Sequence, residues 1–195
     1  MKKRDFLVLD LDDTLVATTP ALCELQTKRT GVQHDIASCT SHGRLWGLER
    51  HELVELMDLH LASGATRNPP FIPNVIDCLH FLSRHFRLAV ITARNEEYCF
   101  ETRRQLRAAG CDFHRVHHAT NRHGTIPKSQ ICLDYGYEMI IDDHLTTANE
   151  CAASGIRAFL FGTYPWNTQG ELHSNVQRVL TWPEICQLLI PAPRD

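Results

Sequence analysis

A short apolar run that ends in acidic residues, Phe6-Leu-Val-Leu-Asp10-Leu-Asp12-Asp13-Thr14-Leu15, decides the fold of this chain. Its apolar residues are typical of a strand that is buried on both faces, as in the middle of a parallel sheet. Asp10, Asp12 and Asp13 follow at the C-terminal end of that strand, where open α/β sheets bind their ligands. Because adjacent carboxylates repel one another and are costly to bury alone, the stretch predicts a bound cation.

The rest of the chain alternates predicted strands with predicted helices. Further strands are expected at residues 88–91, 113–117, 138–141 and 157–161, with a polar loop at 118–127 and a last helix that begins at Thr181. This alternation predicts parallel pairing through right-handed crossovers. The expected fold class is therefore α/β, with a doubly wound, mostly parallel five-stranded sheet.

The segment between the first two strands predicts a small helical cap. One helix is expected over residues 20–30, after Thr19 as N-cap and before Gly31, and a second over 48–63, before Gly64. The prolines of residues 68–73 then hold the returning chain extended. We expect a core domain of residues 1–15 and 71–195 and a cap domain of residues 16–70, inserted after the first strand.

Composition narrows the class of protein. Of the 195 residues, 43% are hydrophobic and 22% charged, as in ordinary globular domains, and the net charge of −3 argues against a broad basic surface for long nucleic acid. No apolar run approaches the roughly 20 residues of a membrane span, and the N-terminal one is too short for a signal peptide. We therefore expect a cytoplasmic protein, whose eight scattered cysteines are reduced core residues.

Chemistry-bearing residues follow three of the predicted strands. Asp10 and Asp12 stand two residues apart on an extended strand end, so both carboxylates can address one substrate atom. This suits a nucleophile, Asp10, and a proton carrier, Asp12. Asp142 ends another strand, and Mg²⁺ bound between Asp10, Asp142 and a phosphate oxygen would supply positive charge.

Phosphoryl transfer also needs groups that bind the phosphate oxygens. Thr92, which follows the strand at 88–91, offers a hydroxyl, and Lys128, which opens the helix after the polar loop, offers a point charge. The chain has only four lysines, and the other three lie at positions 2, 3 and 28. Lys128 is therefore the lysine expected in the site, with Arg122 as its substitute if Lys128 is solvated.

The ordered set of motifs resembles the haloacid dehalogenase (HAD) superfamily. Asp10-Leu-Asp-Asp-Thr14 resembles its motif I, Val90-Ile-Thr92 its motif II, Lys128 its motif III and Ile140-Ile-Asp-Asp143 its motif IV. The resemblance implies a magnesium-dependent phosphatase with a HAD-like Rossmannoid core. It implies that Asp10 is the nucleophile and that Asp12 is both acid/base and, through its backbone carbonyl, a metal ligand. The remaining roles it implies are phosphate binding by Thr92 and Lys128 and metal binding by Asp142, with Asp143 in or beside the metal's ligand set.

Within the superfamily, Ile91-Thr-Ala-Arg94 and Tyr164-Pro-Trp-Asn167 look most like the 5'(3')-deoxyribonucleotidase branch, although Asn74 stands where that branch commonly has glycine. The expected function is a phosphomonoesterase that acts through a phospho-aspartate on a nucleotide or a related small phosphorylated metabolite. Two alternatives stay open. One is a polynucleotide 3'-phosphatase, and the other is a catalytically silent binding or regulatory module.

Several residues have two interpretations. Arg94 either contacts the phosphate or sugar of the substrate or forms a structural salt bridge. Trp46 either stacks on a nucleobase or packs the core of the cap. Trp166 is interpreted as a packing residue beside the crevice. Histidines that invite a metal hypothesis are interpreted as solvated surface residues: His117, His118 and His123.

Overall fold

The computed structural model describes residues 4–39 and 45–190, so positions 1–3, 40–44 and 191–195 of the predicted domains lie outside the described ranges. One sheet runs through the molecule in the order β4-β3-β2-β1-β5-β6-β7. All neighbouring strands pair in parallel except β4, which is antiparallel to β3. The strands are β1 (Phe6–Leu9), β2 (Arg87–Asn95), β3 (Phe113–Asn121), β4 (Gly124–Thr125), β5 (Met139–Asp142), β6 (Arg157–Phe161) and β7 (Val176–Val179).

Helices cover both faces of this sheet, which confirms the doubly wound α/β class. Alternate side chains of β1 enter different cores, as the two-residue period of a strand requires. Leu7 and Leu9 pack on the side of α3 (Val75–Leu82), α4 (Cys99–Ala108) and α7 (Trp182–Leu189). Val8 packs on the side of α5 (Lys128–Tyr135) and α6 (Leu145–Ala153). No helix within the described ranges is long and apolar enough to cross a membrane.

The predicted count of five strands was wrong, because the described residues form a sheet of seven. The predicted polar loop at 118–127 is instead the end of β3 and a short hairpin to β4, in which Thr120 pairs with Thr125. The polar residues of β3 lie near the sheet edge, where strands tolerate exposed side chains, so apolar periodicity did not reveal them. β7 is four residues long with only its two valines buried, which gives an equally weak local signal.

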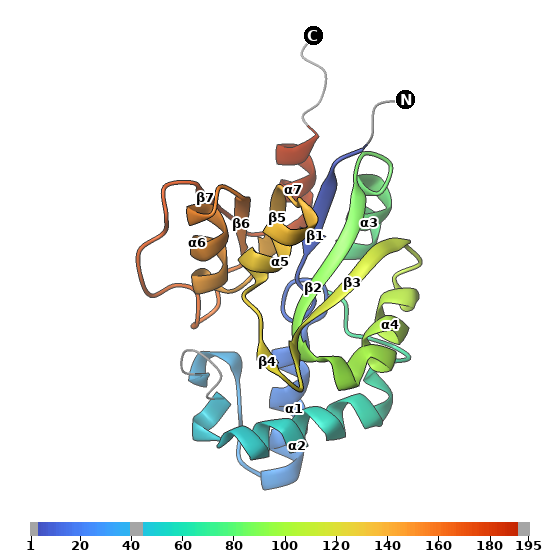
Figure 1. Cartoon of the computed structure of the whole chain (residues 1–195). Coiled ribbons are helices and arrows are strands. Elements are labelled where there is room, and N and C mark those ends of the chain that lie inside the picture. Colours follow the sequence, from blue (N-terminus) through green and yellow to red (C-terminus); the bar gives the residue numbers. More distant parts are fainter. Residues whose placement is uncertain (1–3, 40–44, 191–195) are drawn as a thin grey trace.

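The segment between β1 and β2, called here the helical insertion (residues 16–70), contains α1 (Thr18–Thr30) and α2 (Arg50–His60). Its described residues also form short 3-10 turns at Ile36–Ser38 and Leu45–Gly47 and a π turn at Leu61–Ala65. In Figure 1 its two helices lie below the sheet, at the end opposite both chain termini. The insertion therefore faces the C-terminal ends of the parallel strands, where the acidic residues emerge.

Two local features differ from or refine the sequence analysis. α1 begins at Thr18, so Thr19 lies inside the helix rather than at its N-cap. Asn74 precedes α3 with φ 64°, the left-handed conformation that glycine adopts without strain and asparagine tolerates better than most residues. This conformation explains why either residue is suitable at position 74.

The eight cysteines are all unpaired, as expected. Five are buried, but Cys99 is exposed, and Cys111 and Cys186 are half-buried. The expectation of core residues is thus confirmed for five of the eight.

Candidate active site

Asp10 follows β1 directly and forms the floor of the candidate site. Its side chain is buried, and its Oδ1 accepts a hydrogen bond from the Leu11 N–H at 2.7 Å. Lys128, the first residue of α5, places its Nζ 2.8 Å from the same Oδ1 and 2.7 Å from Asp142 Oδ2. Burial alone would lower the pKa of Lys128, but the two carboxylates raise it, so the ammonium stays charged. The structure thus brings together three of the predicted site residues in one buried ion pair network.

Asp10, Asp142 and Asp143 form a group suited to a metal ion. All three are buried, and each offers a carboxylate oxygen within 4.8 Å of the other two. Burial raises the pKa of Asp10, which Asp142 and Asp143 raise further while Lys128 opposes the shift. Burial and the charge of Asp142 also raise the pKa of Asp143 to about 8. Burial and mutual repulsion thus disfavour the charged forms of Asp10 and Asp143, and oxygen donors of this kind fit Mg²⁺.

Asp143 is also held by residues outside the acidic cluster. Its Oδ2 accepts a hydrogen bond from Trp166 Nε1 at 2.6 Å, and its Oδ1 one from Thr14 Oγ1 at 3.4 Å. Trp166 stacks on Tyr164, with ring centroids 4.6 Å apart and planes 3° from parallel. Trp166 therefore packs against Tyr164, as the sequence suggested for this residue, and it also orients the carboxylate of Asp143.

The carboxylate of Asp12 pairs with Arg94, whereas that of Asp10 pairs with Lys128. Arg94 donates to both of its oxygens, from Nε at 2.8 Å and from Nη2 at 2.6 Å, and Thr18 Oγ1 donates to Oδ1 at 2.5 Å. Burial would raise the pKa of Asp12, but the Arg94 guanidinium outweighs burial and holds that pKa below its usual value. Arg94 thus forms a salt bridge in this structure, and its predicted contact to phosphate stays a prediction.

A buried glutamine orients the Arg94 side chain. Arg94 Nη1 donates to Gln105 Oε1 at 2.6 Å, and Gln105 lies fully buried on α4. Sequence reasoning did not find Gln105, because a single polar residue in an amphipathic helix carries no local signal for a partner eleven positions away.

Removing the Arg94 guanidinium should destabilise the fold. Arg94→Met leaves Asp12 without its bidentate partner, so we expect a loss of about 3 kcal/mol in the free energy of unfolding. Gln105→Leu removes a neutral acceptor of Arg94 and leaves the pair of Arg94 with Asp12 in place, so its expected cost is about 1 kcal/mol. Urea unfolding of both variants measures their free energies of unfolding, and we expect the larger loss for Arg94→Met. A Gln105→Leu variant less stable than Arg94→Met would contradict this expectation.

Asp13, the third carboxylate of the stretch that follows β1, fixes the start of α1. It adopts a left-handed φ of 53°, and its carboxylate accepts hydrogen bonds from the Thr19 N–H at 2.9 Å and the Thr19 hydroxyl at 2.5 Å. Burial raises the pKa of Asp13 to about 7. The aspartate thereby satisfies a free N–H group of the first helical turn, a task that the sequence analysis gave to the Thr19 side chain.

The site opens into a cleft of about 490 Å³ between the sheet and the helical insertion. The lining includes Trp166 and residues that the sequence analysis had placed at the site, namely Asp10, Asp12, Asp13, Arg94, Lys128 and Asp143. It also includes residues that sequence reasoning did not single out for the site: Thr18, Thr19, Leu22, Leu53, Met57, Ala93, His144 and Thr147. His144, on the turn after Asp142, donates its backbone N–H to Asp142 Oδ1 at 2.8 Å. The motif Asp142-Asp143 predicted a functional turn at this position, but it did not predict the hydrogen bond from the His144 backbone.

Other predicted residues lie away from the described lining of the cleft. Thr92 is fully buried, and its Oγ1 accepts the backbone N–H of Arg94 at 3.2 Å. Trp46 donates to the backbone oxygen of Asp35 at 3.3 Å and packs in a small cluster with Cys23, Cys39 and Trp166. Arg122 is exposed in the turn between β3 and β4. The structure thus places Thr92 beside Arg94. It places Trp46 in a packing cluster of the insertion.

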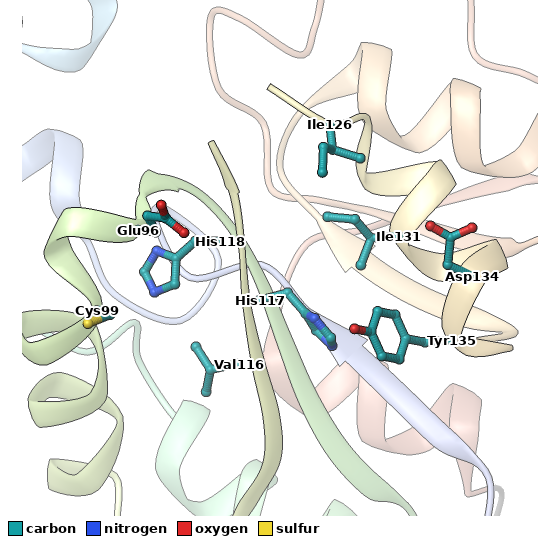
Figure 2. Close-up of a pocket in the computed structure, with 9 residues that line it drawn as sticks. All are labelled: Glu96, Cys99, Val116, His117, His118, Ile126, Ile131, Asp134 and Tyr135. Carbon is teal, nitrogen blue, oxygen red and sulfur yellow. The ribbon is translucent and has the colours of Figure 1, made fainter. Parts of the chain in front are cut away.

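A second hollow, of about 640 Å³, lies along β3. Figure 2 shows His117 beside Tyr135, with ring centroids 4.4 Å apart, and Glu96 and His118 on the other side of the hollow. His117 and His118 are half-buried in β3 rather than solvated, whereas His123 is exposed. The described lining of this hollow includes none of the three carboxylates suited to a metal ion, Asp10, Asp142 and Asp143. We therefore assign the chemistry to the smaller cleft.

Comparison with known proteins identifies the fold. No family model matches the chain, and no curated protein sequence matches it. Among solved structures, it is similar to the HAD-hydrolase YfnB from Bacillus subtilis bound to magnesium (16% identity, TM-score 0.63, 96% of this chain and 99% of that one). It is also similar to a HAD family hydrolase from Deinococcus radiodurans with bound phosphate and sodium (13%, 0.63, 95% and 95%). A third is the L-2-haloacid dehalogenase PA0810 (14%, 0.60, 96% and 100%). The chain therefore has the haloacid dehalogenase-like fold.

Proposed function

We propose that this chain is a magnesium-dependent phosphomonoesterase that acts through a phospho-aspartate on Asp10. Its substrate is a nucleotide or a related small phosphorylated metabolite. The observation that carries the proposal is the position of Asp10, at a strand end in the cleft, paired with Lys128 and beside Asp142 and Asp143. The fold alone does not select this reaction, because one structural neighbour is named a dehalogenase.

The geometry supports a division of labour between the oxygens of Asp10. Its contacts within the described residues go to Oδ1, which leaves Oδ2 to attack. As Oδ2 bonds to phosphorus, the bond from phosphorus to the ester oxygen breaks, and the leaving oxygen takes a proton from Asp12. Water then attacks the aspartyl phosphate and gives its proton to Asp12, and the bond from phosphorus to Oδ2 breaks to release inorganic phosphate.

Asp12 must be protonated before the first step, and its ion pair with Arg94 opposes this. We propose that Arg94 shifts toward the phosphate when the ester binds, because a phosphate dianion competes with Asp12 for the guanidinium. This would reconcile the salt bridge seen here with the phosphate contact predicted from the sequence.

Asp10, Asp142 and Asp143, with the backbone carbonyl of Asp12, are the groups that would hold Mg²⁺. When bound, the ion would neutralise the charge of the acidic cluster and of the phosphate oxygens. Lys128 favours the ionised form of Asp10 and holds Asp142 in place, and Trp166 orients Asp143.

The proposal is tested by phosphate release from 4-nitrophenyl phosphate and from a panel of deoxynucleotides, ribonucleotides and sugar phosphates. We expect turnover with Mg²⁺ that falls to background when EDTA removes the ion. An oligonucleotide with a 3'-phosphate is included, and faster hydrolysis of it than of mononucleotides would favour the polynucleotide phosphatase. Absence of phosphate release from every ester with Mg²⁺ present would overturn the proposed function.

A further inference from the structure

The cleft has two chemically different halves. Its floor carries the charged groups that emerge from the strand ends, including Asp10, Arg94 and Lys128. The helical insertion contributes apolar side chains, which are Leu22 of α1 and Leu53 and Met57 of α2. A phosphate held on the floor would therefore direct the rest of its ester toward an apolar surface.

The two residues from α2 belong to one face of that helix. Leu53 and Met57 are four positions apart, a spacing that places side chains next to each other on a helix. Leu22 is buried, whereas Leu53 and Met57 are half-buried, so their side chains keep surface that is open to a ligand in the cleft. Met57 adds a flexible thioether, which adapts to ligand shape and makes favourable contacts with aromatic rings.

The polar groups that the insertion contributes to the cleft are already engaged. The hydroxyl of Thr18 donates to Asp12 and that of Thr19 donates to Asp13, each at 2.5 Å. Within the described residues of the insertion, none of those lining the cleft is charged. A second anionic group on the substrate would therefore be desolvated there without a partner, which is costly.

We infer that Leu22, Leu53 and Met57 form an apolar subsite that binds an uncharged ring in the leaving group of the phosphomonoester. This inference rests on the proposed function and specifies its substrate class, which is esters with an uncharged ring rather than polyol phosphates or bisphosphates. The cleft volume of about 490 Å³ lies within the range of sites for small molecules.

The test compares benzyl phosphate, glycerol 1-phosphate and 4-carboxybenzyl phosphate, in which the leaving groups are all alcohols of similar reactivity. We expect kcat/KM for benzyl phosphate to exceed that for each of the other two about tenfold or more. Glycerol 1-phosphate or the carboxylated ester hydrolysed as well as benzyl phosphate would overturn the subsite.

Two variants locate the selectivity. Leu53→Asn and Met57→Gln should raise KM for benzyl phosphate about tenfold and leave glycerol 1-phosphate within twofold. The matched control is Leu59→Asn on the same helix, where Leu59 is 43% exposed and outside the lining of the cleft, and we expect it to change neither ester. Circular dichroism verifies folding, and an equal effect of the two cleft variants on both esters would contradict the inference.

A binding experiment separates the subsite from the proposed reaction. Calorimetry with Mg²⁺ present compares benzylphosphonate, which cannot be hydrolysed at its carbon–phosphorus bond, with methylphosphonate. We expect about tenfold tighter binding of benzylphosphonate, lost in Leu53→Asn. Selective binding without hydrolysis of any ester would reject the phosphatase and keep the subsite, whereas equal or undetectable binding of the two phosphonates would reject the subsite.

Discussion

Replacing Asp10 by Asn is expected to abolish turnover and to leave the fold intact. The amide is nearly the same size as the carboxylate but cannot form the phospho-aspartate, so we expect kcat to fall by about a thousandfold or more. Stability should not fall in parallel, because burial and two neighbouring acids already raise the pKa of Asp10 and make its charged form unfavourable. Initial rates of 4-nitrophenyl phosphate hydrolysis and thermal unfolding without Mg²⁺ measure the two effects.

The matched control for this variant is Asp112→Asn, which makes the same chemical change at an exposed position between the end of α4 and the start of β3. We expect wild-type rates for it. If Asp10→Asn kept a tenth or more of the wild-type kcat, Asp10 could not be the nucleophile. A loss of activity that was caused by unfolding would instead appear as a lower midpoint of thermal unfolding for Asp10→Asn than for the wild type.

The second large effect is expected from Lys128→Met. Methionine fills a similar volume but leaves Asp10 and Asp142, both buried, without the ammonium that lies within 2.8 Å of each. Breaking a buried ion pair by removing one partner typically costs about 3–5 kcal/mol, and we expect a loss of that size in urea unfolding without Mg²⁺. Activity should fall at least about a hundredfold, because the cation that is predicted to bind phosphate oxygens is lost from the cleft.

Magnesium should partly rescue this variant, because a ligand that binds only the folded state stabilises it. The control is Lys28→Met, since Lys28 is an exposed residue of α1 in a solvated pair with Glu24 at 3.7 Å. Surface pairs of this kind contribute about 0–1 kcal/mol, so its unfolding midpoint should stay close to that of the wild type. An unfolding midpoint of Lys128→Met equal to that of Lys28→Met would contradict the assigned role of Lys128.

The sequence was most informative where the signal is local. Apolar runs placed β1, β5 and β6, because a buried strand needs consecutive apolar residues whatever its neighbours are. The helix that was predicted to begin at Lys128 does begin there in the structure, since the preceding proline marks a helix start through backbone conformation alone. The edge strands β4 and β7 escaped prediction because their few buried side chains leave no such pattern.

For the candidate site, the sequence by itself predicted the residues that the structure brings together, namely the carboxylates that end the strands and the lysine that opens α5. Only the tertiary structure decided which partner each of them has. Arg94 meets Asp12 across 82 positions of the chain, and Thr14 meets Asp143 across 129. Side-chain direction and long-range packing set such contacts, and neither is encoded in residue spacing. The folded structure therefore gives each aspartate after β1 a different partner. Asp10 forms an ion pair with Lys128, Asp12 forms one with Arg94, and Asp13 accepts a hydrogen bond from Thr19.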